Sequence, residues 1–191
     1  MADGARQDED EDDRDVRQHL AGDAQAFARV VRRHQGWAQQ FTRWFLRDAP
    51  QAVDAAQRAF IELHRALPAY DARGQLRAFL RRVLIRQCLM EARSRDSFAA
   101  LRDRNQAQAP AQAATNAHDD IVRREFRARA QRALAELSDE HRVVFLMRAL
   151  DDASYEEIGA VLGRPRGTLA RWHSEARATM RKLLGDDEER P

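Results

Sequence analysis

Apolar residues recur at helical spacing along almost the whole chain, and this pattern limits the fold more than any other feature. Between residues 16 and 48 the apolar positions include Leu20, Phe27, Val30, Phe41 and Phe45. Similar stripes run through residues 53–67, 76–89 and 121–147. The alternating apolar and polar runs that are typical of half-buried strands are missing. The sequence therefore predicts an all-α fold.

Local signals set the expected helix boundaries. Asp23 follows a glycine and is well placed to cap the next helix. Ala49-Pro50 is expected to end that helix, because proline disfavours helical geometry in the residue before it. Residues 68–74 read as a loop, and Ser138-Asp139-Glu140 as the start of a further helix.

A change of composition divides the chain into two parts. Residues 105–116 contain alanine, glutamine, asparagine, proline and threonine but no large apolar side chain, so they cannot offset the entropy cost of ordering. We therefore expect two small helical domains joined by a flexible linker, the second containing a helix-turn-helix. The expected divisions are an acidic disordered N-terminus over 1–14, a domain over 15–95, the linker over 96–119, a domain over 120–185 and an acidic tail over 186–191.

Composition argues against several classes of protein. No apolar run is long enough to span a bilayer and no signal peptide precedes the first domain, so we expect a cytoplasmic protein without a membrane partner. Phosphate-binding glycine loops, nucleophile turns and clusters of metal-ligating residues are missing. We expect no catalytic residues, no cofactor and no metal. The single cysteine, Cys88, lies on an apolar helix face and is expected in the core.

The net charge is only +2, but arginines are clustered between acidic ends. Clustered guanidinium groups suit phosphate, whose oxygens they bind in pairs. Taken one at a time, the same arginines also fit solvated helix faces.

The most informative local pattern runs from Ser154 to Arg177. Ser154 and Glu157 form the pattern of a capping box, and Gly163 can adopt the positive φ that ends a helix. A second helix is expected to open near Arg166 and to bury Leu169, Trp172 and Ala176. Two short helices joined by a glycine turn predict a helix-turn-helix.

In such a motif the second helix enters the major groove of DNA. Arginine can pair with guanine there, at about 1–3 kcal/mol of discrimination per good pair. A helical hairpin used only for packing is the alternative. The candidate DNA contacts are Arg166, Thr168, Ala170, Arg171, Ser174 and Arg177.

These residues resemble the extracytoplasmic-function (ECF) sigma factors of the sigma-70 family. The C-terminal resemblance lies in residues 137–146, 154–159, 167–169 and 176–177. The N-terminal one lies in residues 21–27, 31–34, 57–63, 67–70 and 76–83. It implies two helical domains that bind core RNA polymerase and direct promoter-specific initiation without catalysis.

The resemblance also implies roles for individual residues. The C-terminal domain would read the −35 promoter element and contact the flap of the polymerase β subunit. The N-terminal domain would bind the β′ clamp helices and read the −10 element, with Tyr70 stacking on an unpaired base. The −10 candidates are Tyr70, Asp71, Arg73, Gln75, Arg77, Phe79, Arg82 and Arg86. The polymerase-binding candidates are Gln51, Asp54, Gln57, Arg58, Phe60 and Ile61.

The chain departs from the family pattern where it is expected to meet polymerase. Gln51-Ala52-Val53-Asp54 replaces an acidic run, and Arg58 stands where an acid is usual. Fewer acids facing a basic clamp predict weak docking until negative charge is restored. Phosphorylation by a Ser/Thr kinase would restore it, with Thr42 as the candidate, or the acidic N-terminus would supply it. An anti-sigma factor is a further partner that the resemblance implies. Phe79, Arg86 and Trp172-His173 also differ from the usual residues and bear on which promoter is read.

Two other functions fit the same residues. The chain would be a helix-turn-helix regulator that does not join polymerase, or a helical interaction protein that does not bind DNA. A sigma factor should direct specific initiation when it is added to purified core polymerase, and neither of these alternatives should.

Overall fold

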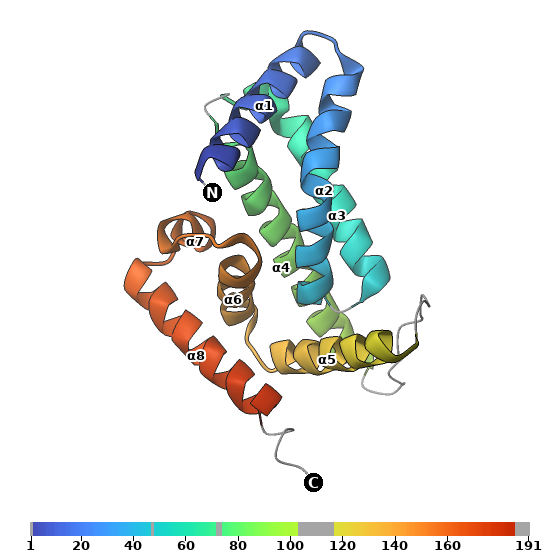
Figure 1. The fold of residues 1–191 in the computed structure, drawn as a ribbon, viewed down its shortest axis with the longest axis vertical. Helices are drawn as coiled ribbons and strands as arrows, with labels where there is room; N and C mark the ends of the chain where they lie inside the picture. Colours follow the sequence, from blue (N-terminus) through green and yellow to red (C-terminus); the bar gives the residue numbers. More distant parts are fainter. Residues whose placement is uncertain (1, 47, 72–73, 103–116, 186–191) are drawn as a thin grey trace.

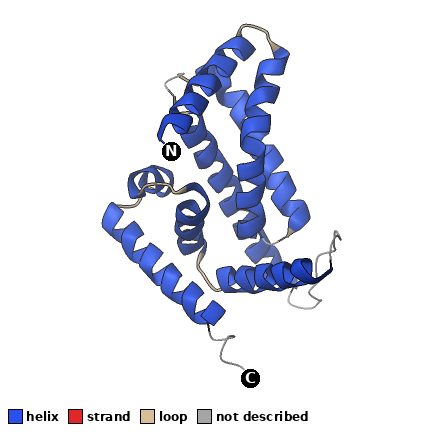
Figure 2. Cartoon of the chain, viewed as in Figure 1, coloured by secondary structure: helices blue, strands red, loops and turns tan. Residues whose placement is uncertain are grey.

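The computed structural model describes residues 2–46, 48–71, 74–102 and 117–185, and every regular element in these ranges is a helix (Figures 1 and 2). The predicted all-α fold with two helical units is confirmed, and the second unit contains the helix-turn-helix. The elements are α1 (Ala2–Leu20), α2 (Ala24–Leu46), α3 (Ala49–Ala66), the short 3-10 helix η1 (Leu67–Ala69), α4 (Leu76–Arg102), α5 (Ala117–Ala135), α6 (Asp139–Asp151), α7 (Tyr155–Leu162) and α8 (Arg166–Gly185).

Helices α1 to α4 form the first unit around an apolar core. Phe41 and Phe45 of α2 stack with ring centroids 6.2 Å apart, and Leu63 of α3 and Leu80 of α4 are fully buried beside them. Asp48 caps α3 by accepting the backbone N–H of Gln51 at 2.9 Å. Pro50 thus lies in the first turn of α3, where its missing N–H costs nothing, and α2 ends earlier at Leu46.

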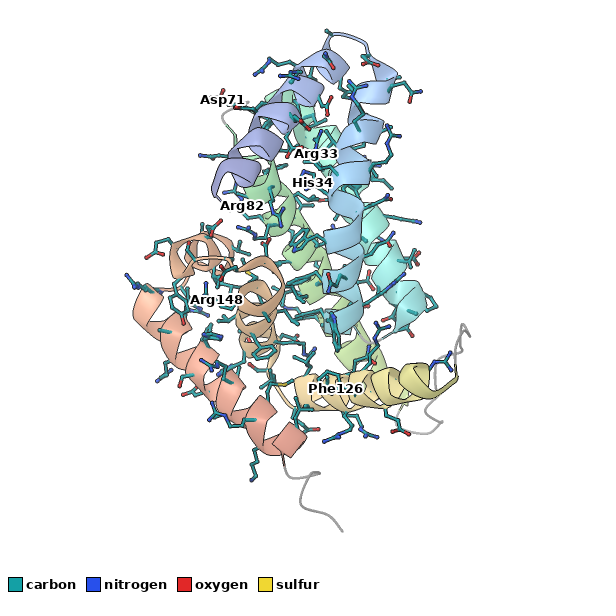
Figure 3. All side chains as sticks on the ribbon, in the orientation of Figure 1. Arg33, His34, Asp71, Arg82, Phe126 and Arg148 are labelled. Atoms are coloured by element: carbon teal, nitrogen blue, oxygen red, sulfur yellow. The ribbon has the colours of Figure 1, made fainter. Side chains whose placement is uncertain are left out.

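Residues 2–20 form helix α1, where the sequence predicted disorder over residues 1–14, and the second half of this helix is packed. Asp12 and Asp13 are 1% and 8% exposed. Arg33 of α2 pairs with Glu11, Asp12 and Asp15, and the Asp12 carboxylate lies 2.7 Å from His34 Nε2. Figure 3 shows Arg33 and His34 pointing from α2 toward α1. These partners offset the negative charges of Glu11, Asp12 and Asp15.

Helices α5 to α8 form the second unit. Ser138 caps α6 through the backbone N–H of His141, as predicted. The core of this unit contains Val143, Val144, Met147, Ile158, Leu169 and Ala176, all fully buried.

The two units are in contact through α6 and α7, which pack against α4, while α6 also packs against α2 (Figure 1). Arg142 lies at this contact and is 7% exposed. Its guanidinium donates hydrogen bonds to the carbonyl oxygens of Leu134 at 2.8 Å, Leu137 at 2.9 Å and Phe45 at 3.3 Å. One buried cation therefore ties the ends of α2 and α5 to α6.

The predicted linker falls largely on residues 103–116, and the predicted tail on residues 186–191, which lie outside the described residues. The flanking parts of the predicted linker, residues 96–102 and 117–119, belong to α4 and α5. None of the described helices combines the length and apolar character needed to cross a membrane.

Candidate nucleic-acid interface

The turn between α7 and α8 fixes how α8 is presented. Ser154 accepts the Glu157 N–H and Glu157 accepts the Ser154 N–H, which completes the predicted capping box. Gly163 ends α7 with φ +65°, a conformation that side chains disfavour. A Cβ on Gly159 would lie 3.1 Å from the Arg164 carbonyl oxygen, so the turn packs tightly against α7. Sequence reasoning missed this role of Gly159.

Helix α8 buries one side and presents basic and polar residues on the other. Leu169 and Ala176 are fully buried, and Trp172 is half-buried against the His141 ring, with centroids 5.4 Å apart. Among the predicted DNA contacts, Thr168 and Ala170 are half-buried. The exposed ones are Arg166, Arg171, Ser174 and Arg177. The first three turns of α8 therefore carry the surface that reading a major groove requires.

His173 lies between this surface and α7. Its Nδ1 is 2.9 Å from the Tyr155 hydroxyl. Partial burial, together with the positive charges of Arg148 and Arg177, lowers the pKa of His173. The neutral imidazole is thus the form that fits this position.

The predicted −10 residues gather around the start of α4. Asp71, Gln75, Arg82 and Arg86 are exposed, and Arg73 lies outside the described residues. The half-buried residues are Tyr70, Arg77 and Phe79. The Tyr70 and Phe79 rings lie with centroids 6.1 Å apart, and the Arg82 guanidinium lies 5.7 Å from the Phe79 centroid. Aromatic and cationic groups are therefore side by side, as stacking on single-stranded nucleic acid requires.

Two arginines of α4 contact acids of the second unit. The Asp151 carboxylate lies 2.6 Å from Arg77 Nη2 and 2.5 Å from Arg81 Nε, the second being an ion pair rather than a hydrogen bond. Arg81 also donates to Glu157 at 2.8 Å. Burial disfavours the Glu157 carboxylate, but hydrogen bonds from Arg81 and Ser154 outweigh it and lower the pKa of Glu157. Arg81 is 4% exposed, so the solvated helix face considered for single arginines does not apply to it.

The predicted polymerase-binding residues lie along α3. Asp54, Gln57, Arg58 and Ile61 are exposed, Gln51 is half-buried, and Phe60 belongs to the core. Arg58 is not an isolated positive charge, because its guanidinium pairs with Glu91 of α4. Thr42, the predicted phosphorylation site, is fully buried and its hydroxyl donates to the Gln39 carbonyl, so a kinase cannot reach it in this fold.

Each unit matches a family model. Residues 30–98 match "Sigma-70 region 2", and residues 127–180 match "Sigma-70, region 4". The two matches contain the start of α4 and the helix-turn-helix, respectively.

Curated relatives agree with this assignment. The chain is 28% identical over 167 residues to the ECF RNA polymerase sigma factor SigM of Mycobacterium tuberculosis, covering 87% of this chain and 81% of the relative. It is 24% identical over 178 residues to the ECF RNA polymerase sigma factor SigW of Bacillus subtilis, covering 90% and 95%.

Solved structures share the arrangement of helices. CnrH, in complex with the cytosolic domain of CnrY, matches with a TM-score of 0.68 at 25% identity, over 93% of this chain and 99% of that one. The sigma factor RpoE from Bartonella quintana, in complex with the anti-sigma factor NepR, matches with a TM-score of 0.64 at 20% identity, over 85% and 98%, which speaks for the fold alone. From the two family matches and these relatives, the chain belongs to the sigma-70 family and is an ECF sigma factor, a non-enzymatic protein that directs transcription initiation.

Proposed function

We propose that this sigma factor uses two separate surfaces on promoter DNA, the exposed side of α8 for the −35 element and the start of α4 for the −10 element. The proposal rests on which side of α8 the fold leaves exposed. The buried Leu169 and Ala176 fix its orientation, while Arg166, Arg171 and Ser174 extend into solvent from its first three turns. On a groove edge, arginine supplies paired donors for guanine.

The test is DNA selection by the reconstituted holoenzyme. Duplex libraries randomised over the upstream element are selected with the wild type and with Arg171→Ala, Ser174→Ala and Arg181→Ala. Arg181 is an exposed arginine farther along α8, so its variant matches the loss of charge. We expect Arg171→Ala and Ser174→Ala to reduce discrimination at particular bases by about tenfold, within the range for one base contact. Equal effects from Arg181→Ala would contradict base reading by this side of α8.

We propose further that α3 binds the β′ clamp helices of core polymerase, and that it does so weakly. Asp54, Gln57 and Ile61 form an exposed strip, and Ile61 is 50% exposed although it is large and apolar. Only one of these three residues is acidic, so the attraction to a basic clamp is small. Because Arg58 pairs with Glu91, its positive charge should weaken binding to the clamp less than an unpaired arginine would.

Core-binding affinity tests weak docking. The variant Gln51→Asp, Val53→Glu, Arg58→Gln adds two negative charges and removes one positive charge. Glutamine is chosen at position 58 because a glutamate there would face Glu91. We expect about tenfold tighter binding at low salt, with the gain reduced at high salt. Arg65→Gln, an exposed change at the end of α3, is the control. Equal affinities for wild type and triple variant would remove the hypothesis.

Glu11, Asp12 and Asp15 are poor sources of the missing charge, because they pair with arginines of α2. An anti-sigma factor remains a proposed partner, which the family implies; CnrH, which matches at 25% identity, was solved in complex with the cytosolic domain of CnrY. The β flap is the proposed polymerase contact of the second unit.

A regulator that does not join polymerase would instead require a resident sigma factor for every transcript.

A further inference from the structure

Asp13 of α1 joins both ends of the loop that precedes α4. Its Oδ2 accepts the backbone N–H of Gly74 at 2.7 Å, and its Oδ1 accepts the Tyr70 hydroxyl at 3.2 Å. The Tyr70 oxygen in turn accepts the backbone N–H of Gln75 at 3.0 Å. One carboxylate and one phenol thus hold two loop amides that lie outside the helical hydrogen-bond pattern.

The chemistry of this network favours fixed positions for Tyr70, Gly74 and Gln75. A carboxylate acceptor makes stronger hydrogen bonds than a neutral one, and this carboxylate is 8% exposed, which limits competition from water. Gly74 has φ +68°, a conformation that glycine adopts without the steric cost of a Cβ. Burial and the nearby Asp13 carboxylate raise the pKa of Tyr70 to about 12, so the phenol keeps the proton that it donates.

Helix α1 is itself held in place. Val16 is 1% exposed in the core, and Asp15 pairs with Arg29 at 2.7 Å and with Arg33 at 2.9 Å. These contacts fix the position of α1 against α2, and Asp13 extends from α1 toward the loop. It lies outside both segments that match the family models.

We infer that Asp13 is a positioning residue for −10 recognition, which sets the Tyr70 ring and the Gly74–Gln75 backbone in the conformation that receives an unpaired base. This inference rests on the proposed role of the start of α4. Residues that are held in place before binding lose less entropy when the DNA arrives, so the benefit of holding Tyr70, Gly74 and Gln75 appears as selectivity and affinity for the −10 strand. The anchor comes from a part of the chain whose composition suggested disorder.

The opposite role for the same carboxylate is a mask, in which Asp13 occupies amides that DNA needs. The geometry favours positioning, because both oxygens are used inside the network and the side chain is buried. The two roles predict opposite signs when the carboxylate is removed, and this difference makes the test decisive.

The experiment uses full-length chain assembled with core polymerase. The probe is a fork-junction DNA whose non-template strand carries ten randomised unpaired positions, and the readout is the enrichment ratio at the most selective position. Asp13→Ala and Tyr70→Phe should each lower this ratio by about five- to tenfold, the scale of one ordinary intramolecular hydrogen bond. The double variant should be no worse than either single one, because both changes break the same network.

Asp13→Asn should retain part of the selectivity, since an amide can still accept from Gly74 and donate to Tyr70. Asp10→Asn, an exposed acid of the same helix, is the control and should leave the ratio unchanged. Selection on a duplex −35 library should be unchanged in every variant, which separates the effect from general unfolding. If Asp13→Ala prevents folding, Tyr70→Phe still tests the network, because it keeps the ring and removes only the hydroxyl.

Tighter DNA binding by both Asp13→Ala and Asp13→Asn would show a mask and overturn the inference. Unchanged selectivity in Asp13→Ala and Tyr70→Phe would also overturn it, while leaving the proposed function intact. If the wild type itself selects no sequence on this probe, the proposed −10 role of α4 has failed instead.

Discussion

Replacement of Asp151 by asparagine should weaken the contact between the two helical units. The Asp151 side chain is 1% exposed and contacts both Arg77 and Arg81, whose side chains are 40% and 5% exposed. Asparagine keeps the shape but removes the charge. The change therefore leaves the buried Arg81 guanidinium with Glu157 as its remaining partner across this contact.

The magnitude follows from burial. Removing one partner of a fully buried ion pair costs about 3–5 kcal/mol. Glu157 retains part of that interaction for Arg81, and the exposed Arg77 contact contributes less than about 1 kcal/mol. We expect a loss of about 2–3 kcal/mol in the contact between the units, which shifts the ratio of docked to separated molecules by roughly 30- to 150-fold.

Fluorescence energy transfer between labels on the two units measures this shift. Cys88 is the only cysteine and is fully buried, so cysteines introduced at Arg65 and Lys182 should react selectively. Asp151→Asn should lower the transfer efficiency at a salt concentration where the wild type remains docked. It should also bind single-stranded DNA more tightly, because Arg77 and Arg81 are released.

Asp152→Asn is the matched control, since the Asp152 side chain is 90% exposed and asparagine accepts its positive φ of 44°. If Asp151→Asn and Asp152→Asn gave the same transfer efficiency and the same salt dependence as the wild type, the ion pairs would not hold the units together.

Three further outcomes are expected. Arg142→Met should lower the free energy of unfolding by about 2–4 kcal/mol in chemical denaturation, because the Leu134, Leu137 and Phe45 carbonyls lose a buried donor; a loss below about 0.5 kcal/mol would contradict this. Gly159→Ala should cost about 1–2 kcal/mol and weaken duplex binding, because the new methyl group meets the Arg164 carbonyl oxygen; Gly167→Ala, which meets open space, is the control, and equal stabilities would refute the argument. The folded state lowers the pKa of His173 and so binds fewer protons than the unfolded state; stability should therefore fall as the pH drops below the ordinary histidine value of 6.5. His173→Gln should flatten that part of a pH–stability profile, and an unchanged profile would count against the assignment.

Features encoded by neighbouring residues were predictable from the sequence. Ser138, Ser154 and Gly163 mark helix ends through contacts within a few positions, and the structure has each of these ends where the sequence predicted it. Pro50 was read as the end of one helix, whereas it opens the next, because Asp48 caps α3 two residues earlier.

Features that depend on distant pairs were not predictable. Asp13 meets Gly74 across 61 positions, and Arg81 meets Glu157 across 76. Nothing in the local sequence distinguishes Asp13 from its acidic neighbours or Arg81 from the arginines around it. Their roles follow from how α1 lies on α2 and how α7 lies on α4, which patterns of neighbouring residues do not reveal.

Transcription by purified core polymerase free of other sigma factors tests the central claim most directly. The template is a library of genomic fragments from the organism that carries this chain, and the readout is the set of transcript 5′ ends. We expect discrete start sites that appear only when the chain is added and that share two short upstream elements at fixed spacing. Start sites that never appear, or that appear only when another sigma factor is supplied, would contradict it.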